Sequence, residues 1–164
     1  MEEPMPDALE ASLDRAASLC ARRGAQLTEL RRQVLRLVLE SGQPVGAYAL
    51  LDRLKASRAG AAPPTVYRAL DFLVEQGLIH KVERLGAFIG CAEVEEHPDD
   101  CDCGAAHDHP HQFLICARCG GTMEISDPGV ALALHRAAAA AGFALTRSTV
   151  EAEGLCAACR DAAG

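Results

Sequence analysis

At 164 residues the chain can form one domain of ordinary size or two small ones. Small domains bury too little surface to be stable without an additional crosslink such as a disulfide or a bound metal ion. Its acidic N-terminus has no secretory pattern and no stretch reaches the roughly 18 apolar residues of a membrane span, which excludes a membrane partner and predicts a cytoplasmic protein. The net charge of −7 argues against binding to nucleic acid, but it is the average of two unlike halves. Residues 15–84 are basic, with twelve Lys and Arg against six Asp and Glu. Residues 86–164 are acidic, with four Arg against twelve Asp and Glu.

The basic half has the pattern of a small helical domain that ends in a hairpin. Apolar residues recur at helical spacing, Thr28 stands where a residue caps the second helix, and Pro64 suits the first turn of the fourth. The predicted helices cover residues 7–23, 28–40, 47–57 and 65–75, and two strands joined by a tight turn at Gly86 cover residues 78–84 and 87–91. In a winged helix, the helices come first along the chain and such a hairpin follows them. The recognition helix would then be residues 65–75.

The acidic half begins with a polar segment and continues as a small mixed unit. Residues 93–111 have almost no apolar content and are predicted to form a linker rich in metal-binding side chains. Beyond it we predict strands at 112–117 and 122–125, a helix at 128–141, a strand at 144–152 and a cysteine-rich turn. This unit is too small to be stable alone, so its apolar edge is expected to pair with a second copy.

The sequence thus predicts an α+β fold built from two domains. An N-terminal winged helix-turn-helix DNA-binding domain would occupy residues 1–91, and a hinge rich in metal ligands would occupy residues 92–111. A small C-terminal α/β dimerisation domain would occupy residues 112–164.

Four cysteines in two CxxC pairs carry the strongest chemical signal: Cys116, Cys119, Cys156 and Cys159. Two intervening residues let both thiolates of a pair reach one ion, and four thiolates complete a closed tetrahedral shell around zinc. Such a shell has no open position for a substrate, which predicts a structural site. A pair of redox motifs is the alternative, but neither pair follows a strand in a thioredoxin-like pattern. A zinc deaminase is disfavoured because Leu155, rather than proline, precedes the second pair.

A second set of metal-binding side chains lies along the chain on both sides of the linker. His80 and Cys91 come from the predicted hairpin, a histidine cluster at 107–111 follows, and Glu124 lies beyond it. An ion held by His80 and Cys91 from one side and by His109 and Glu124 from the other would fix the relative orientation of the two domains, as a metal sensor requires. Taken singly, His80 is also compatible with an ordinary strand residue and Glu124 with a solvated charge. A thiolate with imidazole and one carboxylate suits zinc, so Cys91 favours zinc over iron or manganese.

These motifs resemble those of the ferric uptake regulator superfamily, and within it the zinc uptake regulator branch. The resemblance runs from about residue 8 to residue 160. The matching segments are Leu27-Thr28, Pro63-Pro64-Thr65-Val66-Tyr67-Arg68-Ala69-Leu70-Asp71-Phe72-Leu73, His80-Lys81-Val82-Glu83, Cys91, Phe113 to Gly120, Gly142-Phe143 and Gly154 to Cys159. The Pro-Pro-Thr-Val-Tyr-Arg block together with two spaced CxxC pairs is highly specific.

The resemblance implies about two zinc ions per chain, one structural in the four-cysteine site and one regulatory. The regulatory ligands would be His80, Cys91, His109 and Glu124. The local histidine pattern departs from the usual string of the family, which leaves the place of His109 open to a substitute. The possible substitute or accessory ligands are His97, Cys101, Cys103, His111 and His135. The family does not require the two linker cysteines, which either bind a further zinc with neighbouring histidines or belong to a disordered acidic loop.

For DNA, the resemblance implies a zinc-loaded homodimer that reads a pseudo-palindromic operator in double-stranded DNA and represses zinc import genes. Tyr67 and Arg68 would enter the major groove from the recognition helix, with Thr65 beside them. Tyr48 is similar to a family residue that contacts DNA. Basic side chains would bind phosphates, although each is also compatible with a solvated surface charge. They are Arg22, Arg23, Arg31 and Arg32.

Two other functions compete with zinc-dependent repression. A sensor of iron, manganese or peroxide would have the same fold, but Cys91 counts against it, as does Phe113, which stands where iron sensors commonly place a histidine. A thiol oxidoreductase or a zinc hydrolase is the enzyme alternative, but no motif offers an open zinc position with a placed general base. We therefore expect neither an enzyme nor a small-molecule substrate other than the metal ion.

Overall fold

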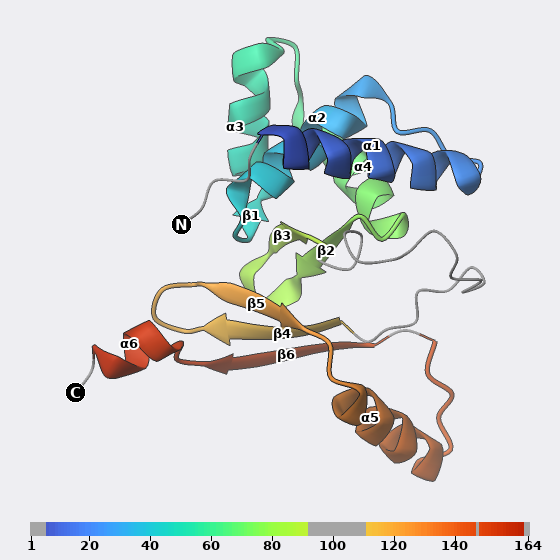
Figure 1. The fold of residues 1–164 in the computed structure, drawn as a ribbon, viewed down its shortest axis with the longest axis vertical. Helices are drawn as coiled ribbons and strands as arrows, with labels where there is room; N and C mark the ends of the chain where they lie inside the picture. Colours follow the sequence, from blue (N-terminus) through green and yellow to red (C-terminus); the bar gives the residue numbers. More distant parts are fainter. Residues whose placement is uncertain (1–5, 92–110, 147, 163–164) are drawn as a thin grey trace. The chain divides into compact units, whose positions relative to one another are not determined.

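The computed structural model describes residues 6–91, 111–146 and 148–162 (Figure 1). The chain divides into two compact units, Met1–Cys101 and Asp102–Gly164. The division falls within the segment expected to be the hinge, and each unit has its own sheet. Among the described helices, none combines the length and the apolar surface needed to cross a membrane.

Four helices build the N-terminal unit and lie close to the predicted positions. They are α1 (Pro6–Arg22), α2 (Glu29–Ser41), α3 (Ala47–Ser57) and α4 (Pro63–Glu75). Helix α4 begins at Pro63, one residue before the proline predicted in its first turn, because Pro63 and Pro64 both fit a first turn, where backbone N–H groups have no partner within the helix. Thr28 precedes α2 as predicted, but its side chain makes no capping hydrogen bond.

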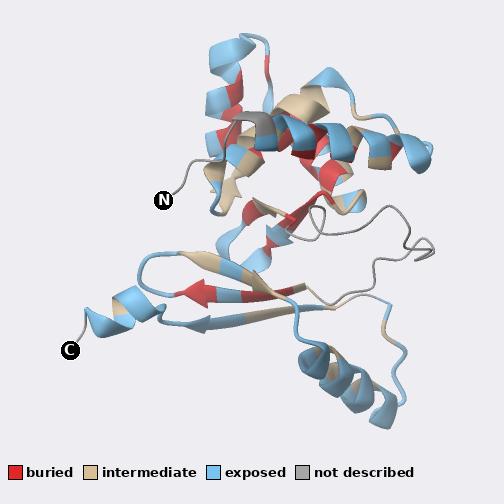
Figure 2. Cartoon of the chain, in the orientation of Figure 1, coloured by how far each residue is buried: buried red, intermediate tan, exposed pale blue. Residues whose placement is uncertain are grey.

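The hydrophobic core of this unit forms where the four helices meet, as Figure 2 shows. Each helix turns its apolar residues inward at helical spacing, which confirms the predicted amphipathic pattern. The fully buried large side chains of the helices are Leu13, Val34, Leu35, Val38, Leu50, Leu54, Val66, Leu70 and Leu73. Because α4 buries one side in this core, its opposite side stays accessible, and Tyr67 and Arg68 are exposed there.

A small antiparallel sheet completes the N-terminal unit. It contains β1 (Val45–Gly46), β2 (Ile79–Val82) and β3 (Ala87–Gly90) in the order β1-β3-β2, with a 3-10 turn, η1 (Glu83–Leu85), between the last two. The first hairpin strand was predicted to run to residue 84 and instead ends at Val82, because η1 takes up the next residues. A β-carbon at Gly90 would lie 2.6 Å from Leu39 Cδ2, so glycine permits the close approach of β3 to α2.

The C-terminal unit consists of a three-stranded sheet with two helices. Its elements are β4 (His111–Cys116), β5 (Thr122–Ile125), α5 (Pro128–Ala140), β6 (Thr149–Gly154) and α6 (Ala157–Asp161). The order is β5-β4-β6, with β4 antiparallel to β5 and parallel to β6. The prediction of a strand at 144–152 was wrong in its bounds, because all six residues of β6 pair with the six residues of β4. The final turn also contains a helix, α6, that was not predicted.

The C-terminal unit has little buried surface of its own. Among its described residues, only Gln112, Phe113, Ile115 and Cys116 are buried, and all four belong to β4. Helix α5 has no buried residue and is almost wholly exposed in Figure 2. The exposed large apolar side chains of the unit are Leu114, Met123, Val130, Leu132, Phe143 and Leu155. A unit with so small a core needs a metal ion or a second chain to be stable.

Candidate metal centres and nucleic-acid surface

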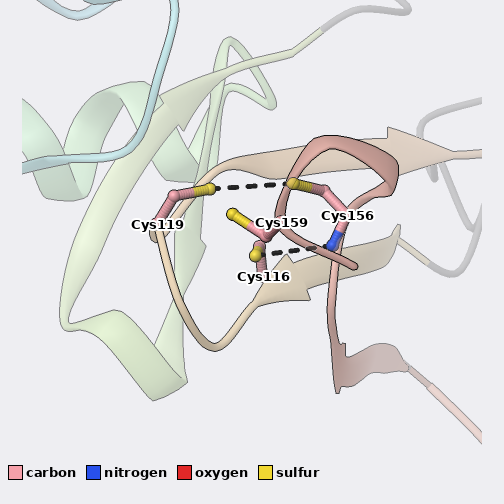
Figure 3. Close-up of side chains that lie close together, drawn as sticks. All are labelled: Cys116, Cys119, Cys156 and Cys159. Atoms are coloured by element: carbon pink, nitrogen blue, oxygen red, sulfur yellow. Dashed lines mark hydrogen bonds between the residues drawn. The ribbon is translucent and has the colours of Figure 1, made fainter. Parts of the chain in front are cut away.

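The four cysteines of the two CxxC pairs converge at one end of the C-terminal sheet (Figure 3). Cys116 ends β4 and Cys119 follows in the turn to β5, whereas Cys156 precedes α6 and Cys159 lies within it. The parallel pairing sets Cys116 opposite Gly154, so both pairs leave the sheet at the same end. All four Sγ atoms lie within 4.8 Å of one another.

The spacing of the sulfur atoms fits a tetrahedral ion. Sulfur ligands at about 2.3 Å from zinc are roughly 3.8 Å apart in a tetrahedron, and Cys119 Sγ and Cys156 Sγ are separated by 3.9 Å. All four cysteines are free of disulfides. A set of four soft thiolates suits zinc and leaves no coordination position open, so the arrangement can hold structure together but cannot activate a substrate.

The backbone around Cys116 stabilises a thiolate. The Cys156 N–H donates to Cys116 Sγ at 3.4 Å. Backbone hydrogen bonds from Cys156, Cys119 and Arg118 lower the pKa of Cys116 to about 6. The hydrogen bond with the Cys156 thiol and burial raise the pKa of Cys159 to about 12. The backbone donors around Cys116 therefore favour the thiolate form, which is the form that binds a metal ion.

Arg118 joins the two cysteine turns and was not singled out in the sequence. Its Nη1 donates to the carbonyl oxygen of Cys159 at 2.9 Å. Gly120 has a φ of 71°, a conformation that favours glycine, and its N–H donates to Cys116 O at 2.9 Å. The signal that could have identified Arg118 is its position as the one charged residue inside the two CxxC pairs.

The hairpin of the N-terminal unit carries two candidate sensor ligands. His80 lies in β2 opposite Ile89, and Cys91 follows the end of β3. The Cys91 N–H donates to Leu78 O at 3.1 Å, so the ladder continues one residue past β3. Alternation along β3 then places Cys91 on the same face of the hairpin as Ile89 and His80. Both His80 and Cys91 are buried, and they present an imidazole and a thiol at neighbouring positions of one face.

The C-terminal unit brings His111 and Glu124 together. His111 begins β4, and Glu124 lies in β5 opposite Phe113. His111 Nδ1 is 3.4 Å from Glu124 Oε1, and the Glu124 side chain is only 12% exposed. A nearly buried carboxylate beside an imidazole is suited to bind a cation, with one group orienting the other.

The remaining predicted ligands gain no support from the structure. His97, Cys101, Cys103 and His109 lie outside the described residues. His135 is exposed on α5 and, within the part of the chain that the structure describes, belongs to no group of three or more potential ligands. The predicted accessory site at His135 is therefore not formed by its described neighbours.

Helix α4 offers an exposed surface near its N-terminal end. Tyr67 and Arg68 are exposed and Thr65 is half-buried. Tyr48, the second residue of α3, is 70% exposed. Among the described residues, no hydrogen bond or ion pair engages Arg68, so its guanidinium group is available to a ligand. The exposed Tyr67 beside an available arginine on α4, and the exposed Tyr48 on α3, are side chains that can stack on or hydrogen-bond to nucleic acid.

Arg32, predicted to contact phosphates, is engaged within its own unit. Its Nη2 donates to Asp14 Oδ1 at 2.7 Å and to Glu10 Oε2 at 3.0 Å, both in α1. Arg36 also pairs with Glu10, and the two guanidinium groups lower the pKa of that carboxyl. A phosphate contact by Arg32 would require breaking these bonds, so the structure argues against the prediction for this residue.

Arg31 and Arg23 are likewise engaged, Arg31 with α4 and Arg23 with the residue that follows it. The guanidinium carbon of Arg31 lies 3.5 Å from the centroid of the Phe72 ring. Arg23 Nη1 donates to the carbonyl oxygen of Gln76, just after α4, at 2.6 Å. The predicted phosphate contact of Arg31 is thus also disfavoured. Arg22, at the end of α1, is exposed.

Comparison with known proteins finds that this chain is similar to regulators of metal uptake. A sequence profile of the ferric uptake regulator family matches residues 22–153. The zinc uptake regulation protein of Escherichia coli strain K12 is 43% identical over 147 residues, which cover 90% of this chain and 80% of that protein.

Two solved structures are similar along nearly the whole chain. A zinc uptake regulator complexed with zinc and DNA gives a TM-score of 0.83 at 41% identity, over 94% of this chain and 97% of the other. The crystal structure of holo XcZur gives a TM-score of 0.76 at 42% identity, over 92% and 98%. The resemblance and the fold class predicted from the sequence are confirmed.

Proposed function

This chain belongs to the ferric uptake regulator family, and we propose that it is a zinc-responsive transcriptional repressor that binds operator DNA as a zinc-loaded homodimer and represses zinc uptake genes. The observation that carries the proposal is the similarity, over 94% of this chain, to a zinc uptake regulator complexed with zinc and DNA. A protein with this role works where the DNA is, in the cytoplasm. We assign it no catalytic activity, because a closed four-thiolate site has no open position for a substrate.

The first part of the proposal is a structural zinc ion held by Cys116, Cys119, Cys156 and Cys159. Its support is the convergence of four sulfur atoms within 4.8 Å. The ion would tie the turn after β4 to the start of α6. A second copy of the chain would cover apolar side chains that are exposed on this unit, among them Leu132 and Phe143.

The second part is a regulatory zinc ion held by His80, Cys91, His109 and Glu124. The burial of His80 and Cys91 on one face of the hairpin supports their role. His111 lies 3.4 Å from Glu124 and would orient its carboxylate or take the place of His109. An ion that requires all four ligands binds tightly only to arrangements of the chain that supply them together, so zinc would select those arrangements.

The third part is operator recognition by α4. Arg68 would donate to a guanine in the major groove, with Tyr67 and Thr65 beside it and Tyr48 contacting DNA from α3. The exposure of Tyr48, Tyr67 and Arg68 near the N-terminal ends of α3 and α4 supports the assignment. The availability of the Arg68 guanidinium distinguishes it from Arg31 and Arg32, whose groups are already bonded.

A zinc-dependent gel-shift experiment tests the function. The probe is a duplex selected from a random-sequence library by the zinc-loaded protein, and a scrambled duplex of the same composition is the control. We expect binding of the selected duplex with Zn²⁺ and loss of binding after chelation. Binding with Fe²⁺ or Mn²⁺ but not with Zn²⁺ would favour a sensor of another metal, and failure to select any duplex would refute a DNA-binding role.

Replacing Cys91 by alanine should remove the regulatory zinc and leave the structural one. Wild-type protein is expected to hold about two zinc ions per chain and the Cys91→Ala variant about one, since three hard or borderline ligands hold zinc less tightly without the thiolate. Metal analysis after gel filtration measures both values.

Cys20→Ala is the matched control for this experiment, because it removes a buried thiol from α1 of the same unit. It should retain about two zinc ions. A Cys91→Ala variant that keeps both ions would contradict the assignment of Cys91. Loss of both ions, or unfolding of this variant alone, would contradict a purely regulatory role for it.

A further inference from the structure

Two arginines attach the C-terminal end of α4 and the residue after it to the rest of the unit. Arg31, in the first turn of α2, covers the Phe72 ring, with its guanidinium carbon 3.5 Å from the ring centroid. The Nη1 of Arg31 also donates to Gln26 O at 2.7 Å. Arg23, just after α1, donates to Gln76 O at 2.6 Å. The guanidinium group of Arg31 therefore stacks on Phe72 of α4 and also donates a hydrogen bond to the loop before α2.

The stacking contact on Phe72 lies on the same side of α4 as its exposed arginine. Phe72 is four residues after Arg68, and residues spaced by four stand one above the other on a helix. The ring that Arg31 covers is therefore one helical turn away from the Arg68 side chain. A rotation or tilt of α4 that moved Arg68 would have to break the stacking on Phe72.

We propose that Arg31, acting through Phe72, is a positioning residue for DNA recognition: it holds α4 so that Arg68 meets the correct base pair. The hydrogen bond from Arg23 to Gln76 assists by holding the end of the same helix. The inference rests on the proposed DNA-binding function. A planar guanidinium can stack on a ring and donate within its plane at the same time, whereas the ammonium group of lysine cannot do both.

This role and direct phosphate binding predict different salt dependence. Log affinity falls with log salt concentration, and loss of a phosphate contact reduces the steepness of this fall, the salt slope, by about 0.9. Loss of a positioning residue lowers the affinity for the selected duplex and leaves that slope unchanged. A residue that only stabilises the fold would change neither quantity at a temperature where the protein stays folded.

A double-mutant cycle on the zinc-loaded full-length protein tests the proposal. The variants are Arg31→Ala, Phe72→Leu and the pair, measured on the duplex selected by the wild-type protein, at several salt concentrations and below the unfolding transition of every variant. We expect each single variant to bind about tenfold more weakly, the double variant no more weakly than either, and an unchanged salt slope. Arg31→Lys should remain close to Arg31→Ala.

The control is Arg36→Ala, which removes the same charge from the same helix but breaks a contact with Glu10 of α1 rather than with α4. It should bind nearly as the wild type. A lowered salt slope for Arg31→Ala, with recovery in Arg31→Lys and additive effects of Phe72→Leu, would assign Arg31 to a phosphate and overturn the proposal. Unchanged affinity of Arg31→Ala would overturn it as well. Failure of the wild-type protein to bind any duplex would instead refute the proposed function.

Discussion

Replacement of Cys156 by serine should release the structural zinc and unfold the C-terminal unit. The expectation follows from the small core of this unit, in which the buried residues among those described all belong to β4. A structural zinc ion contributes on the order of 10 kcal/mol or more to the folding of small domains that lack another source of stability. Because Glu124 of the proposed regulatory site lies in β5 of the same unit, the variant should lose both zinc ions, lose the folding transition of this unit and fail to dimerise. Metal analysis, calorimetry and gel filtration measure the three losses.

Ala158→Ser is the matched control for this experiment. It introduces the same hydroxyl two residues away, at an exposed position inside the second CxxC pair, and leaves all four thiols in place. It should keep its zinc, its folding transition and its dimer. If Cys156→Ser also kept its zinc and its folded C-terminal unit, the four-cysteine assignment would be wrong.

Replacement of Arg68 by alanine should abolish selective recognition of the operator. Arg68 is exposed on α4, and within the described residues no hydrogen bond or ion pair engages it. A bidentate arginine–guanine pair contributes about 1–3 kcal/mol to base discrimination, so the affinity for the selected duplex should fall about tenfold to a hundredfold. The affinity for a scrambled duplex should change little. Titrations of both duplexes at one salt concentration measure the ratio.

Arg68→Lys separates base reading from simple attraction to phosphates. Lysine keeps the charge but cannot form the two parallel hydrogen bonds that arginine offers to guanine. The lysine variant should therefore resemble the alanine variant on the selected duplex and the wild type on the scrambled one. If lysine restored the full affinity for the selected duplex, Arg68 would be a phosphate contact rather than a base contact.

The helices were predictable because their signals are local. Ala47–Ser57 has the predicted bounds, and α2 ends at Ser41, before Gly42 with a φ of 58°. Two strands were not predictable in this way. β1 is only two residues long and exists by pairing with β3, and the bounds of β6 are set by the length of β4 rather than by a pattern in its own residues.

The candidate site shows the same division between local and tertiary information. The four cysteines were predictable because two residues between a pair of cysteines allow both thiolates to reach one metal ion, whatever the rest of the fold. The contacts of Arg32 were not, since its partners Glu10 and Asp14 lie 22 and 18 residues earlier in the chain and only packing of α1 on α2 brings them near. A charge pattern identifies which residues are basic, but it does not say which of them are already neutralised within the fold.

The parallel ladder between β4 and β6 gives the four-cysteine site a second consequence. Strand β6 has no buried residue, so burial of apolar side chains does not specify which of its residues faces which residue of β4. A slip of one residue would move Cys156 and Cys159 by about 3.3 Å relative to Cys116 and turn the strand over. Zinc–sulfur distances tolerate only about 0.2 Å. The metal would therefore accept a single alignment of the two strands, and it would supply the specificity of pairing that the sequence of β6 lacks.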